Sequence, residues 1–174
     1  MTGEADVYER GRLKFSSEGL DFFSEDGQTG ASASNRIRGV VLHGILSRVV
    51  LPEDLHSSVR QAVLVGDLTD EEAEAAEALL SERIAGTESR GWFPADRNAV
   101  MNERELIDVD GGVYRPDRVV LSSGTVYVID YKFGVHDPKY VRQIGRYADI
   151  FRRMGYADVR AALWYVQTGE VMEF

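Results

Sequence analysis

The stretch YRPDRVVLSSGTVYVIDYKFG, residues 114–134, decides the fold because it predicts two β-strands joined by a turn. Its arms RVVL and TVYVIDYK are rich in β-branched and aromatic residues, and Ser-Ser-Gly separates them. Side chains alternate along a strand, so Asp130 and Lys132 share one face while Tyr131 takes the other. Asp117 lies on the first arm. Two carboxylates and a lysine therefore converge at the end of apolar strands, which suits a divalent metal ion and phosphate chemistry.

Length, composition and charge limit the possible classes of protein. The 174 residues suffice for one domain with a core, and the absence of cysteine excludes disulfides and cysteine-bound iron–sulfur clusters. The sequence shows no apolar run as long as a membrane span and no signal-peptide pattern, so we expect a cytoplasmic protein without membrane contact. The net charge of −9 argues against non-specific binding to nucleic acid. However, residues 67–88 hold eight acidic residues and one arginine, whereas residues 139–153 hold five basic residues and one aspartate. The net charge alone therefore does not decide whether the chain binds nucleic acid.

Periodicity and end signals predict the remaining elements. Residues 1–35 are expected to be an N-terminal extension or linker, and residues 36–174 a single domain. Helices are expected from Ser34 or Asn35 to the break at Pro52, over 53–66, over 68–86 with a Thr69–Glu72 capping box, and from Pro138 to Gly155. Strands are expected over 103–109, 113–121 and 125–132, as an antiparallel meander, and over 158–169. The fold class is therefore α/β (α+β), with a central mixed sheet flanked by helices.

Two of these helices carry polar side chains of interest. His43 lies between Gly39 and Ser47 on a narrow small-or-polar line of an otherwise apolar helix, so it is either a core histidine or a metal ligand in a polar cavity. On the helix from Pro138, the predicted buried face is Val141, Ile144, Ala148 and Phe151. The basic side chains gather on another face: Lys139, Arg142, Arg146 and Arg153. Gln143 and Tyr147, four residues apart, lie on the border between the two faces.

Taken together, these pieces resemble the PD-(D/E)xK nuclease superfamily, and within it the RecB-like nuclease domains at the C-termini of UvrD/Rep-type and AddA-type helicases. The matching segments span about residues 36 to 168: GVVLHGIL with His43, ERELI with Glu103 or Glu105, YRPDRVV with Asp117, VIDYK with Asp130 and Lys132, and QIGRY with Gln143 and Tyr147. The Asp…Asp-x-Lys pair alone is weak evidence for this family. Its occurrence between an upstream histidine and a downstream Gln-x-x-x-Tyr, in that order, is much more specific. The resemblance implies a restriction-endonuclease-like core.

The resemblance also implies roles for individual residues. Metal ligands would be His43, Asp117, Asp130 and the backbone carbonyl of Tyr131, with Mg²⁺ or Mn²⁺ as the ion. The catalytic groups would be Asp117, Asp130, Lys132 and Glu105, with Glu103 as the alternative to Glu105 in the neighbouring register. DNA-binding or supporting roles would fall to Gln143, Tyr147, Arg142 and Arg146, on or beside the basic helix face.

The function implied is a metal-dependent deoxyribonuclease, expected to be an exonuclease on single-stranded DNA in repair or recombination. Many relatives carry a cysteine-bound iron–sulfur cluster, which this sequence cannot hold, and the chain has no Walker-type phosphate loop. Its partners would then be DNA and helicase motor domains in a longer chain. The alternative is a non-catalytic module of the same fold that docks DNA or a protein.

Overall fold

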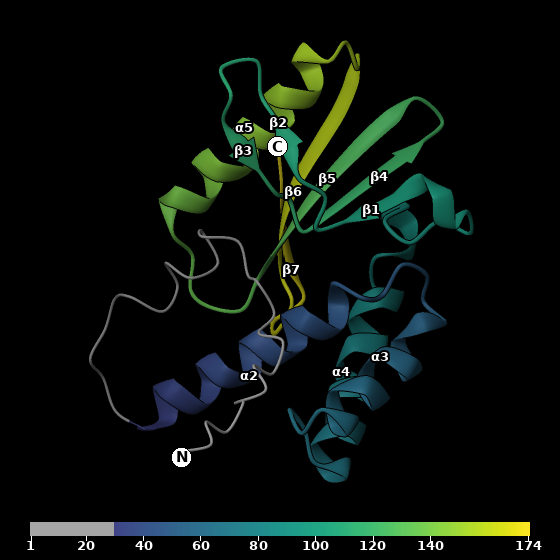
Figure 1. Ribbon diagram of the computed structural model, residues 1–174, viewed down its shortest axis with the longest axis vertical. Coiled ribbons are helices and arrows are strands. Elements are labelled where there is room, and N and C mark those ends of the chain that lie inside the picture. The colour runs from purple at the N-terminus through teal and green to yellow at the C-terminus, as the bar shows by residue number, and fades with distance from the viewer. Residues whose placement is uncertain (1–29) are drawn as a thin grey trace, which may run out of the picture.

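The computed structural model describes residues 30–174, as a five-stranded mixed sheet with helices on both faces (Figure 1). Residues 1–29, the greater part of the predicted extension, lie outside the described residues. The strand order is β1-β4-β5-β6-β7; β1, β4 and β5 are antiparallel neighbours, β6 is parallel to β5, and β7 is antiparallel to β6. The predicted mixed sheet and its meander are confirmed, and no helix among the described residues has the length and apolarity needed to cross a bilayer.

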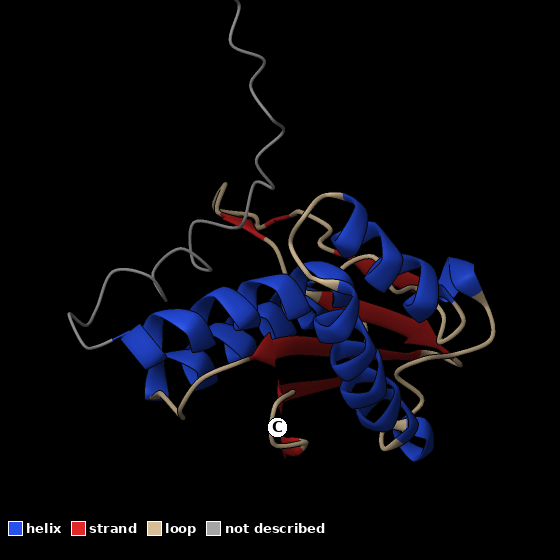
Figure 2. Cartoon of the chain, turned by 90° about the horizontal axis from the view of Figure 1, so that it is seen from below, coloured by secondary structure: helices blue, strands red, loops and turns tan. Residues whose placement is uncertain are grey.

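Three helices cover one face of the sheet (Figure 2). α2 spans Gly30–Leu46, α3 spans Asp54–Leu64 and α4 spans Asp70–Ala85. α2 thus begins upstream of the predicted cap and ends well before Pro52. The capping box is confirmed: the Thr69 hydroxyl accepts from the Glu72 N–H at 3.2 Å, and the Glu72 carboxylate accepts from the Thr69 N–H at 2.9 Å.

The central hairpin forms as its sequence predicts. β4 spans Arg118–Ser122 and β5 spans Thr125–Lys132, with Ser122 opposite Thr125. The two-residue turn between them places Ser123 and Gly124 at φ of 53° and 85°, as a type I′ turn requires. β5 alternates as expected. Val128 packs under α5, whereas Ile129 and Tyr131 pack against α2 to α4.

The predicted strands over 103–109 and 113–121 are wrong in their bounds. The first overlaps only the short β2 (Leu106–Ile107), because β1 (Val100–Asn102) ends before residue 103. The second is divided into β3 (Val113–Tyr114) and β4. Glu103 takes a left-handed φ of 52°, which ends β1, and Pro116 lacks the N–H that would continue a ladder. β2 and β3 form a separate two-stranded sheet. An unbroken strand would have placed residues 103 and 105 on the same face. Because the strand is interrupted, they do not share one.

α5 covers the opposite face of the sheet, and the last two strands complete the sheet. α5 spans Pro138–Arg153, close to the predicted bounds. β6 spans Asp158–Tyr165 and ends before the predicted residue 169, and β7 (Glu170–Glu173) was not predicted. The buried face of α5 includes Tyr147 and Ile150, while Val141 is 37% exposed, contrary to prediction. Val141 lies about 90° from the centre of the buried stripe on a helical projection, at its edge. Short 3-10 turns, Glu88–Arg90 and Arg97–Ala99, lead into β1.

A buried arginine joins the helical layer to the sheet. Arg118, at the start of β4, is 0% exposed. Its guanidinium donates to the carbonyls of Trp92, Val49 and Val50, each at 2.8 Å, and stacks over the Phe93 ring at 4.0 Å. Each of these acceptors is a neutral carbonyl, so burial lowers the pKa of Arg118 from its usual value. The side chain holds the segment after α2 against the sheet.

Replacing Arg118 should therefore destabilise the fold severely. In Arg118→Met the buried carbonyls of Trp92 and Val50 lose their donors, at an expected cost on the order of 3 kcal/mol in unfolding free energy. Arg60→Met, which removes an exposed ion pair with Asp70, should change it by less than about 0.5 kcal/mol. Urea titration followed by circular dichroism measures both, and equal effects of the two variants would contradict the role given to Arg118.

Candidate metal centre

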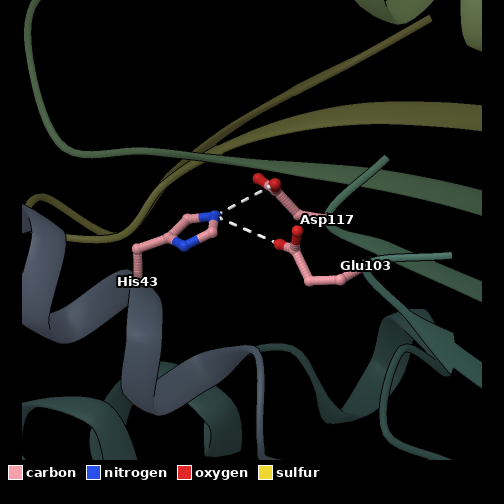
Figure 3. Close-up of side chains that lie close together, drawn as sticks. All are labelled: His43, Glu103 and Asp117. Atoms are coloured by element: carbon pink, nitrogen blue, oxygen red, sulfur yellow. Dashed lines mark hydrogen bonds and ion pairs between the residues drawn. The ribbon is translucent and has the colours of Figure 1, made fainter. Parts of the chain in front are cut away.

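Three chain segments far apart in the sequence bring acidic and imidazole groups together at one end of the sheet (Figure 3). His43 projects from α2, Glu103 follows β1, and Asp117 precedes β4. The His43 Nε2 atom lies 3.0 Å from Asp117 Oδ1 and 3.5 Å from Glu103 Oε1. One ligand atom of each residue lies within 4.8 Å of those of the other two. We call these three side chains the His–Glu–Asp cluster.

Close packing of α2 on the sheet positions His43. A Cβ atom on Gly39, one turn before His43, would lie 2.9 Å from the Phe133 Cβ, so only glycine allows the helix to approach β5 this closely. The imidazole packs edge-on against the rings of Tyr131 and Phe133, with centroids 6.1 and 6.3 Å away. The sequence left open whether His43 is a core histidine or a ligand in a polar cavity. In the structure its imidazole points at carboxylates, as the second interpretation requires.

Asp117 connects the cluster to β5. Its Oδ2 accepts from the Tyr131 backbone N–H at 2.6 Å, and it directly precedes Arg118, which pairs with Ile129 in the β4–β5 ladder. Asp130 is 2% exposed and forms an ion pair with Lys132. The carboxylates and the lysine predicted to converge therefore do so. A metal-ligand role for Asp130 and for the Tyr131 carbonyl stays a prediction.

Of the two glutamates that the sequence left open, Glu103 lies in the cluster, whereas Glu105, the predicted catalytic residue, lies outside it. Glu103 is partly buried in the cluster, and its other carboxylate oxygen pairs with Arg115 Nε at 3.2 Å. Glu105 is exposed to solvent. The left-handed backbone at Glu103 turns the chain out of β1 beside His43, a conformation rare for residues other than glycine. Periodicity cannot reveal such a turn, which is why the sequence alone left both glutamates open.

Lys132 is held by a chain of polar contacts toward α5. Its ammonium donates to Gln143 Oε1 at 3.1 Å and lies 4.1 Å from the Tyr140 ring centroid. Gln143 Nε2 in turn donates to the Tyr147 hydroxyl at 3.0 Å. Tyr147 is 1% exposed, so it supports Gln143 from within the core. Arg142 and Arg146 are exposed on α5, as the predicted basic face requires.

The carboxylates keep both His43 and the neighbouring Lys132 positively charged. Burial disfavours the imidazolium, but Asp117, Glu103 and Asp130 outweigh it and raise the pKa of His43 to about 9. Burial likewise opposes the Lys132 ammonium, yet Asp130 and Asp117 raise its pKa above the usual value. Lys132 therefore acts as a cation rather than as a base at neutral pH.

The carboxylates differ in their affinity for protons. Burial and the neighbouring Asp117 raise the pKa of Glu103 to about 7, and burial raises the pKa of Asp130 to about 6 despite Lys132. Burial also acts on Asp117, but His43 and Lys132 hold its pKa below the usual range. Burial and mutual repulsion thus disfavour the ionised forms of Glu103 and Asp130, and a bound divalent cation would offset both effects.

The donor set suits a hard divalent ion. One imidazole nitrogen and two carboxylates from three segments could hold Mg²⁺ or Mn²⁺. Glu103 Oε1 is buried and faces His43 without a hydrogen bond, as expected for an oxygen that could accept a further cation. An ion at this position would take the place of the His43 proton.

A scan against models of known protein families finds no match for this chain, and a search of curated proteins finds none either. The functional proposal therefore rests on side-chain geometry and on the resemblance of the motifs.

Metal affinity should increase with pH. Below about pH 7 both His43 and Glu103 hold protons that a metal must displace, and between about pH 7 and pH 9 His43 alone does so. The apparent Mn²⁺ affinity should therefore rise about ten-fold per pH unit across the upper interval. Calorimetric titration in buffers of different ionisation enthalpy measures both affinity and proton release. In His43→Ala, binding should be weaker and lose this upper pH dependence; an unchanged profile would exclude His43 as a ligand.

Proposed function

We propose that this chain is a divalent-metal-dependent nuclease domain that hydrolyses phosphodiester bonds of DNA. The observation that supports it most is the His–Glu–Asp cluster, with ligand atoms within 4.8 Å of one another, next to Asp130 and a buried, protonated Lys132. The motif resemblance includes His43, Asp117, Asp130 and Lys132 in the same order, with Glu103 as the alternative to Glu105. No other described group of three or more His, Cys, Asp or Glu residues comes this close.

Each side chain has a part in the proposed reaction. His43, Glu103 and Asp117 would hold Mg²⁺ or Mn²⁺, which when bound polarises a phosphate and activates water near neutral pH. The Lys132 ammonium stabilises charge that develops on the phosphate. Gln143 limits the rotation of Lys132 by accepting a hydrogen bond from its ammonium, and Asp130 pairs with the same ammonium.

The basic side of α5 would receive the DNA backbone. Arg142 and Arg146 are exposed on the helix that carries Gln143, so phosphates bound there lie on the side of the sheet that Lys132 faces. From the resemblance, we further propose exonuclease action on single strands delivered by helicase motor domains of a longer chain, in DNA repair or recombination.

Cleavage of DNA tests the proposal. Single- and double-stranded DNA are incubated with the chain and Mg²⁺, Mn²⁺ or EDTA, and we expect cleavage only with a metal. Asp117→Asn, Glu103→Gln and Lys132→Met should each lower the rate by at least about 100-fold, since each removes a metal ligand or the charge beside the phosphate.

Glu105→Gln is the matched control, because Glu105 is two residues from Glu103 but exposed. It should keep nearly the full rate. Metal and DNA binding without cleavage by the wild type would contradict the nuclease proposal and favour the non-catalytic alternative. Equal losses in Glu103→Gln and Glu105→Gln would contradict the assigned cluster.

A further inference from the structure

A short hairpin leaves the sheet between two residues of the His–Glu–Asp cluster. Residues 104–116 depart after Glu103 and return before Asp117, and β2 pairs with β3 within this segment. The Glu103 N–H donates to the Asp117 carbonyl at 3.0 Å and closes the base. A ligand bound by the hairpin 104–116 would therefore lie at a fixed position relative to the cluster.

The inner face of this hairpin is anchored on α5. Leu106 is 9% exposed and belongs to the core beneath α5, and the Tyr114 ring meets the Tyr147 ring edge-on at 6.2 Å. The buried Asp108 carboxylate pairs with Arg153 of α5 and accepts the Val109 N–H at 2.7 Å. The hairpin is thus held at its base, along its inner face and near its turn.

The outer face is apolar and open to solvent. Ile107 and Val113 stand directly opposite each other across the ladder and are 69% and 61% exposed, and Val109 nearby is 88% exposed. Three exposed β-branched side chains on one short hairpin are unusual, because such residues usually pack in a protein interior. Contiguous exposed apolar surface often marks an interaction site.

The charges around the hairpin indicate what this face binds. Arg146 lies 5.7 Å from the Tyr114 ring, and Arg142 is exposed one turn earlier on α5, so phosphates are favoured on the α5 side. The exposed charged side chains of the hairpin itself are Arg104, Glu105 and Asp110, so negative charge predominates there and disfavours phosphates. A polynucleotide with its phosphates toward α5 would offer its uncharged bases to the outer face.

We propose that Ile107, Val109 and Val113 contact the bases of the single strand whose phosphate lies at the His–Glu–Asp cluster. This inference rests on the proposed nuclease function. Apolar side chains bind the faces of unstacked bases, which are accessible in a single strand but covered within a duplex. Seven residues from Glu103 to Val109 span at most about 24 Å, so the bases contacted lie within about seven nucleotides of the cleaved bond.

The test compares two substrates and two surface variants of the full chain. One substrate is a single-stranded oligonucleotide; the other has the same length but abasic residues around the cleavage site. The hairpin variant is Ile107→Ser/Val109→Ser/Val113→Ser. The matched control is Leu64→Ser/Val65→Ser, which removes side chains exposed by 77% and 58% at the end of α3, away from the cluster.

On the normal strand we expect kcat/KM of the hairpin variant to fall about ten-fold or more, because three apolar contacts with bases are lost, while the control variant matches the wild type. On the abasic strand the wild type and the hairpin variant should be equal. Cleavage of normal DNA at equal rates by the wild type and the hairpin variant would overturn the inference and leave the nuclease function intact.

Two further outcomes separate the remaining explanations. A wild type that cleaves neither strand would overturn the inference together with the proposed function. Self-association of the wild type that is abolished in the hairpin variant, with unchanged cleavage, would overturn it by assigning the outer face to contacts between copies of this chain.

Discussion

The Arg118 guanidinium is the interaction on which the geometry of the cluster depends. It occupies a fully buried position and donates to three backbone carbonyls, two of them in the segment that follows α2. Because Asp117 immediately precedes Arg118, the side chain that anchors the segment after α2 to the sheet is adjacent in sequence to the side chain that His43 reaches. Gly39 adds a second constraint by allowing close contact between α2 and Phe133. Together these two contacts fix the distance between helix and sheet, and with it the distance from His43 to Asp117.

The cluster illustrates a conflict between stability and binding. Three carboxylates lie close together in partly or fully buried positions, and the cations that act on them are His43, Arg115 and Lys132. Burial and mutual repulsion raise the pKa of Glu103 and of Asp130, so ionising them is unfavourable in the folded chain. A divalent cation would remove this penalty, and binding and folding would then reinforce each other. An arrangement that is costly without an ion is what a site selected for ion binding would require.

Local patterns predicted those parts of the structure that local physics determines. The alternation in β5, the Ser-Gly turn, the Thr69–Glu72 capping box and Pro138 at the start of α5 each depend on neighbouring residues alone. The backbone reversal at Glu103 depends instead on tertiary contacts, which is why an unbroken strand was expected there and why Glu105 remained an alternative. β7 is short and begins and ends with glutamate, so it carries little strand signal until β6 offers it an edge. The pairing of His43 with Asp117 spans 74 positions, and only the motif order hinted at it.

Anomalous diffraction from crystals soaked with Mn²⁺ tests the central claim most directly, because it locates an ion without requiring catalysis. The account predicts one strong anomalous peak bounded by His43 Nε2 and the carboxylates of Glu103 and Asp117, at about 2.0–2.3 Å from each ligand atom. The peak should disappear in Asp117→Asn crystals that are otherwise isomorphous. Saturating Mn²⁺ that leaves no peak there, with His43 still hydrogen-bonded to Asp117, would show that these side chains form an internal ion pair and not a metal centre.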